Sequence, residues 1–124
     1  SYLRELMKPA NETEVEMYLL GWAPSTGDAD WVLRPLFASW MWPPKGHNYA
    51  FYYNPKVDEL IKKQMKTIGE ERLAALREAQ ELIVKDAPWI FLVVMYDTIG
   101  AKEDIGGLVY LPIEIPLLKY AYRT

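Results

Sequence analysis

The spacing of hydrophobic positions changes several times along the chain, and each change predicts a different element. Residues 1–8 have the amphipathic pattern of a short helix, which Pro9 ends because proline lacks a backbone N–H group. From Val15 to Leu19 apolar and polar residues alternate, which is the period of a β-strand. We expect this strand to end at Gly21.

A loop and a short helix follow the first predicted strand. Residues 23–30 are rich in Pro, Gly, Ser and Asp, the composition of a loop. The pattern of residues 31–40 is helical, and either Asp30 or Asp28 is in place to cap the helix. Pro35 falls inside this pattern, so we expect a kink there or two short helical pieces.

Two longer helices are predicted in the middle of the chain. Asn54 is a good N-cap, Pro55 takes the first helical position, and an apolar stripe extends to about Thr67. The second helix covers roughly residues 70–85, and Pro88 marks its end.

The last third of the chain contains the remaining predicted strands. Residues 90–95 form an apolar run that suits a buried strand, and weaker strands are expected at 99–101 and 108–111. The tail, residues 112–124, has no clear pattern. The order of strand, helices and strands predicts an α/β or α+β arrangement.

Composition narrows the classes of function. The chain has 124 residues, of which 51% are hydrophobic and 25% charged, as in one small globular domain. The net charge is -3 and no basic stripe is present, so we expect no nucleic-acid partner. No cysteine is present, which removes disulfides, zinc thiolates and thiol nucleophiles. No apolar run approaches the ~20 residues of a membrane helix.

No set of residues has the pattern of a catalytic centre. His47 is the only histidine, and a metal site built from it with Asp28 and Asp30 is an alternative to helix capping by the two aspartates. The paired glutamates between residues 70 and 81 suit a solvated helix face. We therefore expect no enzyme activity, no catalytic residue, no cofactor and no metal.

Several motifs occur in a fixed order and together resemble a known family. They are Leu19-Leu20-Gly21-Trp22, Asp28-Ala29-Asp30-Trp31, Pro35-Leu36-Phe37, Asn48 to Asp58 with Tyr52, Asn54 and Pro55, Ala79-Gln80-Glu81-Leu82-Ile83, Asp86-Ala87-Pro88-Trp89 and Ile105-Gly106-Gly107-Leu108. From about residue 2 to residue 111 the chain resembles the C-terminal part of peptide/nickel-class (family 5) solute-binding proteins of ABC importers. The loop at 25–31 and the run Trp42-Pro43-Pro44 are most similar to glutathione-binding members.

The resemblance implies a fold and a division of the chain. The fold would be α/β, a fragment of the C-terminal lobe of a two-lobed periplasmic-binding-protein (type II) fold, with a mixed sheet flanked by helices. Residues 1–96 would belong to that lobe, and residues 97–124 would return to the other lobe, which is absent. The apolar side chains of 97–124 would then lack partners, so we expect the fragment to self-associate through them.

The resemblance also implies a function. The whole protein would bind a small peptide, such as glutathione or an oligopeptide, between its lobes and deliver it to ABC permease subunits. It would be periplasmic or anchored outside the membrane, with its export signal upstream of this chain. A sensor or signalling input domain with the same fold, or a binder of dipeptides or nickel complexes, are the alternatives.

The resemblance places the ligand on one loop and on the end of the strand at 90–95. The implied ligand-binding residues are Trp22, Ser25, Thr26, Gly27, Asp28, Asp30, Trp31, Met95 and Tyr96. Ser25 stands where dipeptide-binding members usually have an Asp that pairs with the peptide's α-amino group, and a hydroxyl cannot supply that charge. This difference disfavours simple dipeptides as the ligand and is compatible with glutathione, whose amine sits on a γ-linked residue. Alternative roles are core packing for Trp22, helix capping for Asp28, and an ion pair with Arg34 for Asp30.

Overall fold

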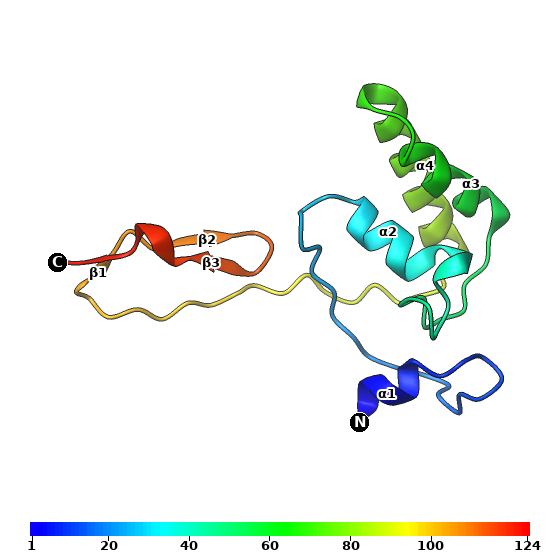
Figure 1. Ribbon diagram of the computed structural model, residues 1–124, viewed down its shortest axis with the longest axis horizontal. Coiled ribbons are helices and arrows are strands. Elements are labelled where there is room, and N and C mark those ends of the chain that lie inside the picture. Colours follow the sequence, from blue (N-terminus) through cyan, green and yellow to red (C-terminus); the bar gives the residue numbers. More distant parts are fainter.

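The computed structural model describes all 124 residues and consists of a helical part and a C-terminal arm (Figure 1). The helical part contains α1 (Tyr2–Leu6), α2 (Asp30–Phe37), the 3-10 helix η1 (Ser39–Met41), α3 (Pro55–Gln64) and α4 (Gly69–Asp86). The arm contains β1 (Ile105–Gly106), β2 (Val109–Leu111), β3 (Ile115–Leu117), η2 (Leu118–Tyr120) and β4 (Tyr122–Arg123). An extended segment, residues 88–104, connects the two and separates them clearly in Figure 1.

The hydrophobic core lies between α2, α3 and α4. Its apolar positions recur every three or four residues on each helix, so each helix turns one face inward. The eleven buried residues are Leu33, Leu36, Phe37, Ala38, Val57, Leu60, Ile61, Ala75, Leu76, Ala79 and Ile83. Trp22, Trp40, Tyr52 and Trp89 cover the edges of this cluster. None of the helices has the length and apolar character needed to cross a membrane.

The start of α3 confirms the local prediction. The Asn54 side chain accepts hydrogen bonds from the backbone N–H groups of Lys56 (2.9 Å) and Val57 (3.3 Å). Pro55 takes the first helical position, where its missing N–H group has no helical partner to lose. The helix ends at Gln64, a few residues earlier than predicted.

Two polar side chains of the Asn48-to-Asp58 motif are buried and fasten the loops to the core. Asn48 is fully buried, and its amide nitrogen donates to the carbonyl oxygens of Ala38 (3.1 Å) and Tyr52 (2.9 Å). Its amide oxygen accepts the Tyr52 N–H (3.0 Å). Asp58 accepts from the backbone N–H (2.9 Å) and the hydroxyl (2.5 Å) of Ser39. These residues of the motif are therefore structural.

The same motif holds the end of α4. The Tyr52 hydroxyl and the Asn54 amide each donate to the Asp86 carboxylate, both at 2.6 Å. These hydrogen bonds lower the pKa of Asp86 from its ordinary value. Ala87 follows in the left-handed region (φ 49°), so the chain turns away from the helix and becomes extended.

The predicted strands at 15–19 and 90–95 are wrong for this chain. Neither segment forms regular secondary structure, and the first contains a bend at Glu16; neither pairs with another strand. Leu19 instead bonds the Tyr2 hydroxyl through its N–H (3.0 Å) and carbonyl (2.9 Å) groups. A strand needs a neighbour for its backbone groups, and these 124 residues place none beside either segment.

The sheets of the structure are small and lie in the arm. β1 pairs with β4 and β2 with β3, both antiparallel, in two separate two-stranded ribbons. The strand predicted at 108–111 is thus confirmed as β2, the one at 99–101 is absent, and β1, β3 and β4 were not predicted. The combination of helices and small sheets agrees with the predicted α/β class. The predicted mixed sheet flanked by helices is not present in these 124 residues.

The predicted division of residues 31–40 into two short helical pieces is confirmed, but the break does not lie at Pro35. The two pieces, α2 and η1, are separated by Ala38 in an extended conformation (ψ 135°). Pro35 itself is buried inside α2. The second predicted long helix is confirmed as α4, with Pro88 two residues beyond its end.

Candidate functional site

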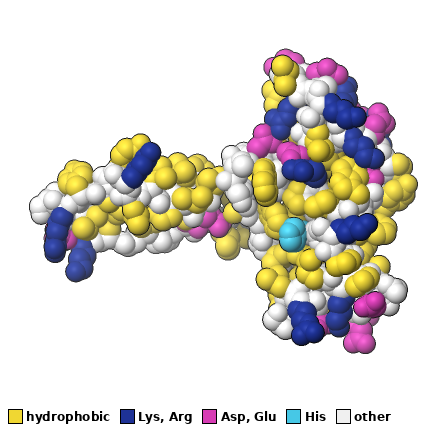
Figure 2. Space-filling view, in the orientation of Figure 1, with side chains coloured by type: hydrophobic (Ala, Val, Ile, Leu, Met, Phe, Trp, Pro, Cys, Tyr) yellow, Lys and Arg dark blue, Asp and Glu magenta, His cyan; other side chains and the backbone are white.

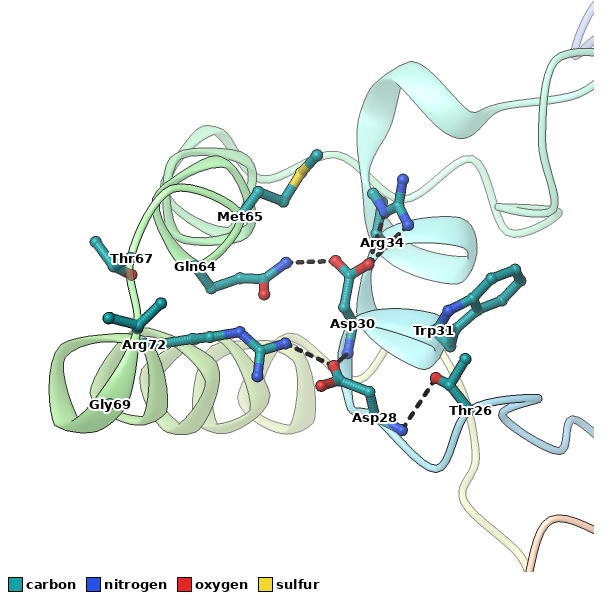
Figure 3. Close-up of a pocket in the computed structure, with 11 residues that line it drawn as sticks. Thr26, Asp28, Asp30, Trp31, Arg34, Gln64, Met65, Thr67, Gly69 and Arg72 are labelled. Atoms are coloured by element: carbon teal, nitrogen blue, oxygen red, sulfur yellow. Dashed lines mark hydrogen bonds and ion pairs between the residues drawn. The ribbon is translucent and has the colours of Figure 1, made fainter.

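A polar pocket of about 690 Å³ lies where the loop before α2 meets the turn between α3 and α4 (Figure 3). Its lining residues are Thr26, Asp28, Asp30, Trp31, Arg34, Gln64, Met65, Thr67, Ile68, Gly69 and Arg72. The structure therefore brings four of the nine predicted ligand-binding residues together here: Thr26, Asp28, Asp30 and Trp31. We call this site the polar pocket.

Asp28 joins the loop to the beginning of α4. Arg72 donates from its guanidinium to the Asp28 carboxylate at 2.6 Å, and the backbone N–H of Asp30 donates to the same oxygen at 2.8 Å. Both bonds stabilise the charged form, so the pKa of Asp28 is lowered from its ordinary value of 3.8. The Thr26 hydroxyl oxygen accepts the N–H of Asp28 (3.3 Å), which leaves the Thr26 hydroxyl hydrogen free to donate.

Asp30 joins α2 to α3. The Arg34 Nε donates to Oδ2 of Asp30 at 3.0 Å, and the Arg34 Nη2 lies 2.7 Å from the same oxygen. The predicted pairing of Asp30 with Arg34 is therefore confirmed. The Gln64 amide donates to the other oxygen of the Asp30 carboxylate. Asp30 does not cap a helix, because it is itself the first residue of α2, whereas Asp28 accepts the N–H of that residue.

The polar pocket is balanced in charge. Its two carboxylates face two guanidinium groups, and Figure 3 shows each acid directed toward a cation from another turn or helix. The acids have therefore used much of their hydrogen-bonding capacity within the chain. To a ligand, the pocket offers donors from a hydroxyl, an amide and the remaining guanidinium N–H groups, and it carries no net charge.

Gln64 and Arg72 were not predicted as site residues. Arg72 lies 44 residues from Asp28 in sequence, and no local spacing rule connects positions so far apart. Only the antiparallel return of α4 along α3 brings them together, and that is a property of the packed helices.

The other loop residues lie outside the polar pocket. The Trp22 indole N–H donates to the carbonyl oxygen of Trp31 (2.8 Å), and its ring lies 5.2 Å from that of His47. Trp22 thus packs against other residues of the chain, which agrees with its alternative role in core packing. Ser25 is exposed, and Gly27 adopts a positive φ of 70°, with Ile113 of the arm near its α-carbon.

Met95 and Tyr96 lie on the extended segment and do not line the polar pocket. Their side chains are 73% and 98% exposed, and neither makes a hydrogen bond. The chain alone therefore does not bring them to the loop at 22–31, because no strand neighbour fixes the position of residues 90–96.

The alternative metal site is not assembled in the structure. His47 Nδ1 lies 2.7 Å from the Tyr49 hydroxyl, while Asp28 and Asp30 bond to arginines. No three His, Asp or Glu side chains gather closely enough to hold a metal ion. These three residues therefore have partners of other kinds.

Most of the chain is similar in sequence to known proteins. No protein-family model matches it. Proteins named glutathione-binding protein GsiB are similar to it: the one of Pectobacterium atrosepticum is 41% identical over 106 residues, that of Salmonella choleraesuis 42% and that of Escherichia coli strain K12 40%. Each match covers 85% of this chain and 21% of the relative, so the chain spans about a fifth of the length of these curated relatives. Over most of its length, the chain is similar in sequence to glutathione-binding proteins, and this confirms the resemblance that its motifs predicted.

Proposed function

We propose that the chain is part of the extracytoplasmic solute-binding component of an ABC importer, one that binds glutathione or a similar small peptide between two lobes. The observation that carries the proposal is the identity of 40–42% over 106 residues to proteins named for glutathione binding. Because those proteins are named as binding proteins, the same observation supports a role in binding without catalysis. The activity belongs to a whole protein, and the relatives are about five times as long as their matched 106 residues.

The proposal assigns the parts of the chain to lobes. Residues 1–96 belong to the C-terminal lobe, and residues 97–124 return to the other lobe. Two features support this division: α2, α3 and α4 share one core to which no residue of the arm contributes, and the arm carries many exposed apolar side chains. Closure of the two lobes would trap the ligand.

The loop at 22–31 supplies the ligand contacts in this proposal. The hydroxyls of Ser25 and Thr26 are free to donate, and Trp22 and Trp31 provide rigid apolar area beside them. Asp28 and Asp30 act as positioning residues, because their carboxylates fasten the loop to α4 and α3. Met95 and Tyr96 reach the ligand only when the rest of the protein holds their segment.

Ser25 favours glutathione over simple dipeptides. A carboxylate at this position would pair with the α-amino group of a dipeptide, and such charge-assisted bonds are about twice as strong as neutral ones. Ser25 is uncharged and exposed, so it cannot select for that amine. Glutathione carries its amine on a γ-linked residue, which places the charge elsewhere.

The proposal includes partners and location. The whole protein would hand its ligand to ABC permease subunits, and it would work in the periplasm or anchored at the outer face of the cell membrane. A sensor input domain of the same fold is the alternative function. Glutathione-dependent stimulation of the ATPase activity of a reconstituted permease supports the importer, and binding without stimulation supports the sensor.

A chimera tests the ligand. In the E. coli relative, the 106 matched residues are replaced by those of this chain, and calorimetry measures binding of glutathione, a series of dipeptides and a nickel complex. We expect binding of glutathione alone. A chimera that melts cooperatively but binds none of them would refute the proposal, and one that binds only dipeptides would refute the interpretation of Ser25.

A matched pair of variants isolates the charge at residue 25. Ser25→Asp and Ser25→Asn have the same size and differ in charge. We expect Ser25→Asp to gain dipeptide binding and to lose about tenfold in glutathione affinity, a typical effect of one charged group. Ser25→Asn should gain no dipeptide binding. Equal behaviour of the two variants would contradict a role for charge at this position.

A further inference from the structure

The loop that carries the proposed ligand contacts has no distant backbone partner. All backbone hydrogen bonds of residues 23–30 join positions three or four apart, and they reach no further along the chain than α2. Ser25, Thr26 and Gly27 form the exposed tip of this loop. Because ordering a loop costs backbone entropy, a loop without distant backbone bonds needs side-chain contacts to hold one conformation. We call residues 23–30 the binding loop.

Two hydrogen bonds join the binding loop to distant parts of the chain, and both are made by side chains. The Arg72 guanidinium donates to the Asp28 carboxylate from 44 residues away, at 2.6 Å. The Gln64 amide donates to the Asp30 carboxylate from 34 residues away. Asp28 also accepts the N–H of Asp30 (2.8 Å), so the two attachments are coupled to each other (Figure 3). We call Arg72 and Gln64 the two anchors.

Both anchors project from packed helices. Gln64 is the last residue of α3 and is 2% exposed, and Arg72 is the fourth residue of α4. The core residue Ile61 lies three positions before Gln64, and the core residue Ala75 lies three positions after Arg72. Each anchor therefore shares a helix face with a buried side chain. A side chain held on a packed helix defines the position of its partner more precisely than one on a loop does.

Charge and partial burial strengthen the attachment to α4. Arg72 and Asp28 are both ionised, and hydrogen bonds between charged groups are stronger than neutral ones. Their side chains are 27% and 39% exposed, so solvent screens this pair less than a pair on the open surface. In Figure 2, basic and acidic side chains lie side by side over the helical part, whereas hydrophobic side chains predominate along the arm. The ionic attachment of the binding loop is thus to the helices.

We propose that Arg72 and Gln64 are positioning residues for the ligand: without touching it, they hold the binding loop in one conformation before the ligand arrives. The inference rests on the proposed function, because that function makes this loop the one that contacts the ligand. Ser25 and Thr26 lie two or three positions before Asp28, so a displacement of Asp28 also displaces their hydroxyls. A loop that is already ordered binds more tightly, because binding then carries no ordering cost.

The two anchors differ in how much depends on them. Without Gln64, the Asp30 carboxylate keeps its ion pair with Arg34 at 2.7 Å. Without Arg72, the Asp28 carboxylate keeps only the N–H of Asp30, which belongs to the start of the neighbouring helix and moves with the loop. Loss of Arg72 should therefore loosen the binding loop more than loss of Gln64.

Hydrogen exchange tests the anchoring without any ligand. NMR measures the exchange of backbone amides 26–30 in the chain and in variants that replace a polar side chain by methionine. We expect Arg72→Met to speed exchange about tenfold and Gln64→Met to speed it less, because bonds that hold a loop lower its rate of opening. The controls Arg77→Met and Gln80→Met alter exposed residues of α4 with no bond to the loop and should change nothing. Amides 79–83 of α4 should keep their rates in every variant. Equal rates in Arg72→Met and Arg77→Met, or an equal rise throughout α4, would overturn the proposal.

The titration of Asp28 gives a second measurement that a general structural role would not change. NMR follows its carboxyl group as the pH is lowered, again without ligand. The Arg72 guanidinium holds the pKa of Asp28 below its ordinary value of 3.8. Arg72→Met should raise this pKa toward 3.8, whereas Arg72→Lys and Arg77→Met should keep it low, because both leave a cation at residue 72. An unchanged titration in Arg72→Met would show that the bond does not hold the loop in solution, which overturns the proposal.

The effect on the ligand is measured in the chimera with the E. coli relative. Calorimetry should show that Arg72→Met weakens glutathione binding about tenfold, which corresponds to about 1.4 kcal/mol. Arg72→Lys should recover most of that loss, and Arg77→Met should bind as the unmodified chimera does. Equal affinity of Arg72→Met and Arg77→Met would overturn the positioning role. If the unmodified chimera binds no glutathione, the proposed function fails, and the exchange and titration measurements still decide whether the two anchors hold the loop.

Discussion

Asn48 provides the sharpest test of how the helical part is held together. It is fully buried, and its amide joins the chain at Ala38, at the end of α2, to Tyr52, just before α3. Three hydrogen bonds of 2.9–3.1 Å use both hydrogens and the oxygen of the side chain. The Asn48→Ala variant removes all three and leaves the Tyr52 N–H without its partner.

The expected loss can be estimated from these contacts. Each hydrogen bond contributes about 1 kcal/mol net, and groups left unsatisfied in the interior add to the cost, so the free energy of unfolding should fall by about 3 kcal/mol. That is a large fraction of the 5–15 kcal/mol typical of a domain. Asn11→Ala is the matched control, because Asn11 is exposed and makes no hydrogen bond, and its loss should be within about 0.5 kcal/mol.

Asn48→Asp refines the test through pH. The introduced carboxyl has the same shape, but when charged it places an oxygen against the carbonyls of Ala38 and Tyr52, where the native amide donates. Burial and these carbonyls raise its pKa in the folded state, so the variant's deficit should shrink as pH falls and the group gains a proton. Urea unfolding of wild type, Asn48→Ala, Asn48→Asp and Asn11→Ala at pH 7 and pH 5 measures this. Losses below about 1 kcal/mol for both Asn48 variants at pH 7 would refute the reasoning.

Three further predictions follow from contacts described above. Asn54→Ala should lower the free energy of unfolding by about 1 kcal/mol and Asn54→Ser by less, in thermal melts, because serine still caps α3; equal losses would argue against capping. The pKa of Asp28 is lowered by Arg72, so their bond stabilises the fold above the ordinary value of 3.8 and is lost as pH falls through the lower folded value. Asp28→Asn should therefore flatten acid unfolding below about pH 4, followed by circular dichroism, and an unchanged curve would contradict this. Removing residues 97–124 should reduce self-association in light scattering, and equal association with and without them would exclude the arm as its cause.

Local signals were predictable from the sequence because their partners are close in the chain. The Asn54-Pro55 start of α3 involves residues two or three positions apart. Asp30 and Arg34 lie one helical turn apart, so their ion pair could be predicted as well. The geometry of proline predicted that residues 31–40 form two pieces, although the chain leaves the helix only at Ala38.

Features that depend on distant partners could not be predicted in this way. Arg72 completes the polar pocket from 44 residues away. The segments 15–19 and 90–95 have the composition of strands, yet alternation reports only that a residue suits a pleated surface, not that a neighbour is available. The family resemblance was recognisable because several of its motif residues, such as Asn48 and Asp58, have structural roles that do not depend on the ligand.

The uncovered segment between α4 and the arm has a consequence for the lifetime of the protein. Proteases bind their substrates as extended chain, and residues 88–101 already have that form, with no backbone hydrogen bond to break. Phe91 and Tyr96, both more than half exposed, are side chains that aromatic-specific proteases accept. Any part of the protein that covers this segment would therefore also hide a cleavage site. Molecules in which the segment is covered would resist such proteases, and molecules in which it is exposed would be cut between the helical part and the arm.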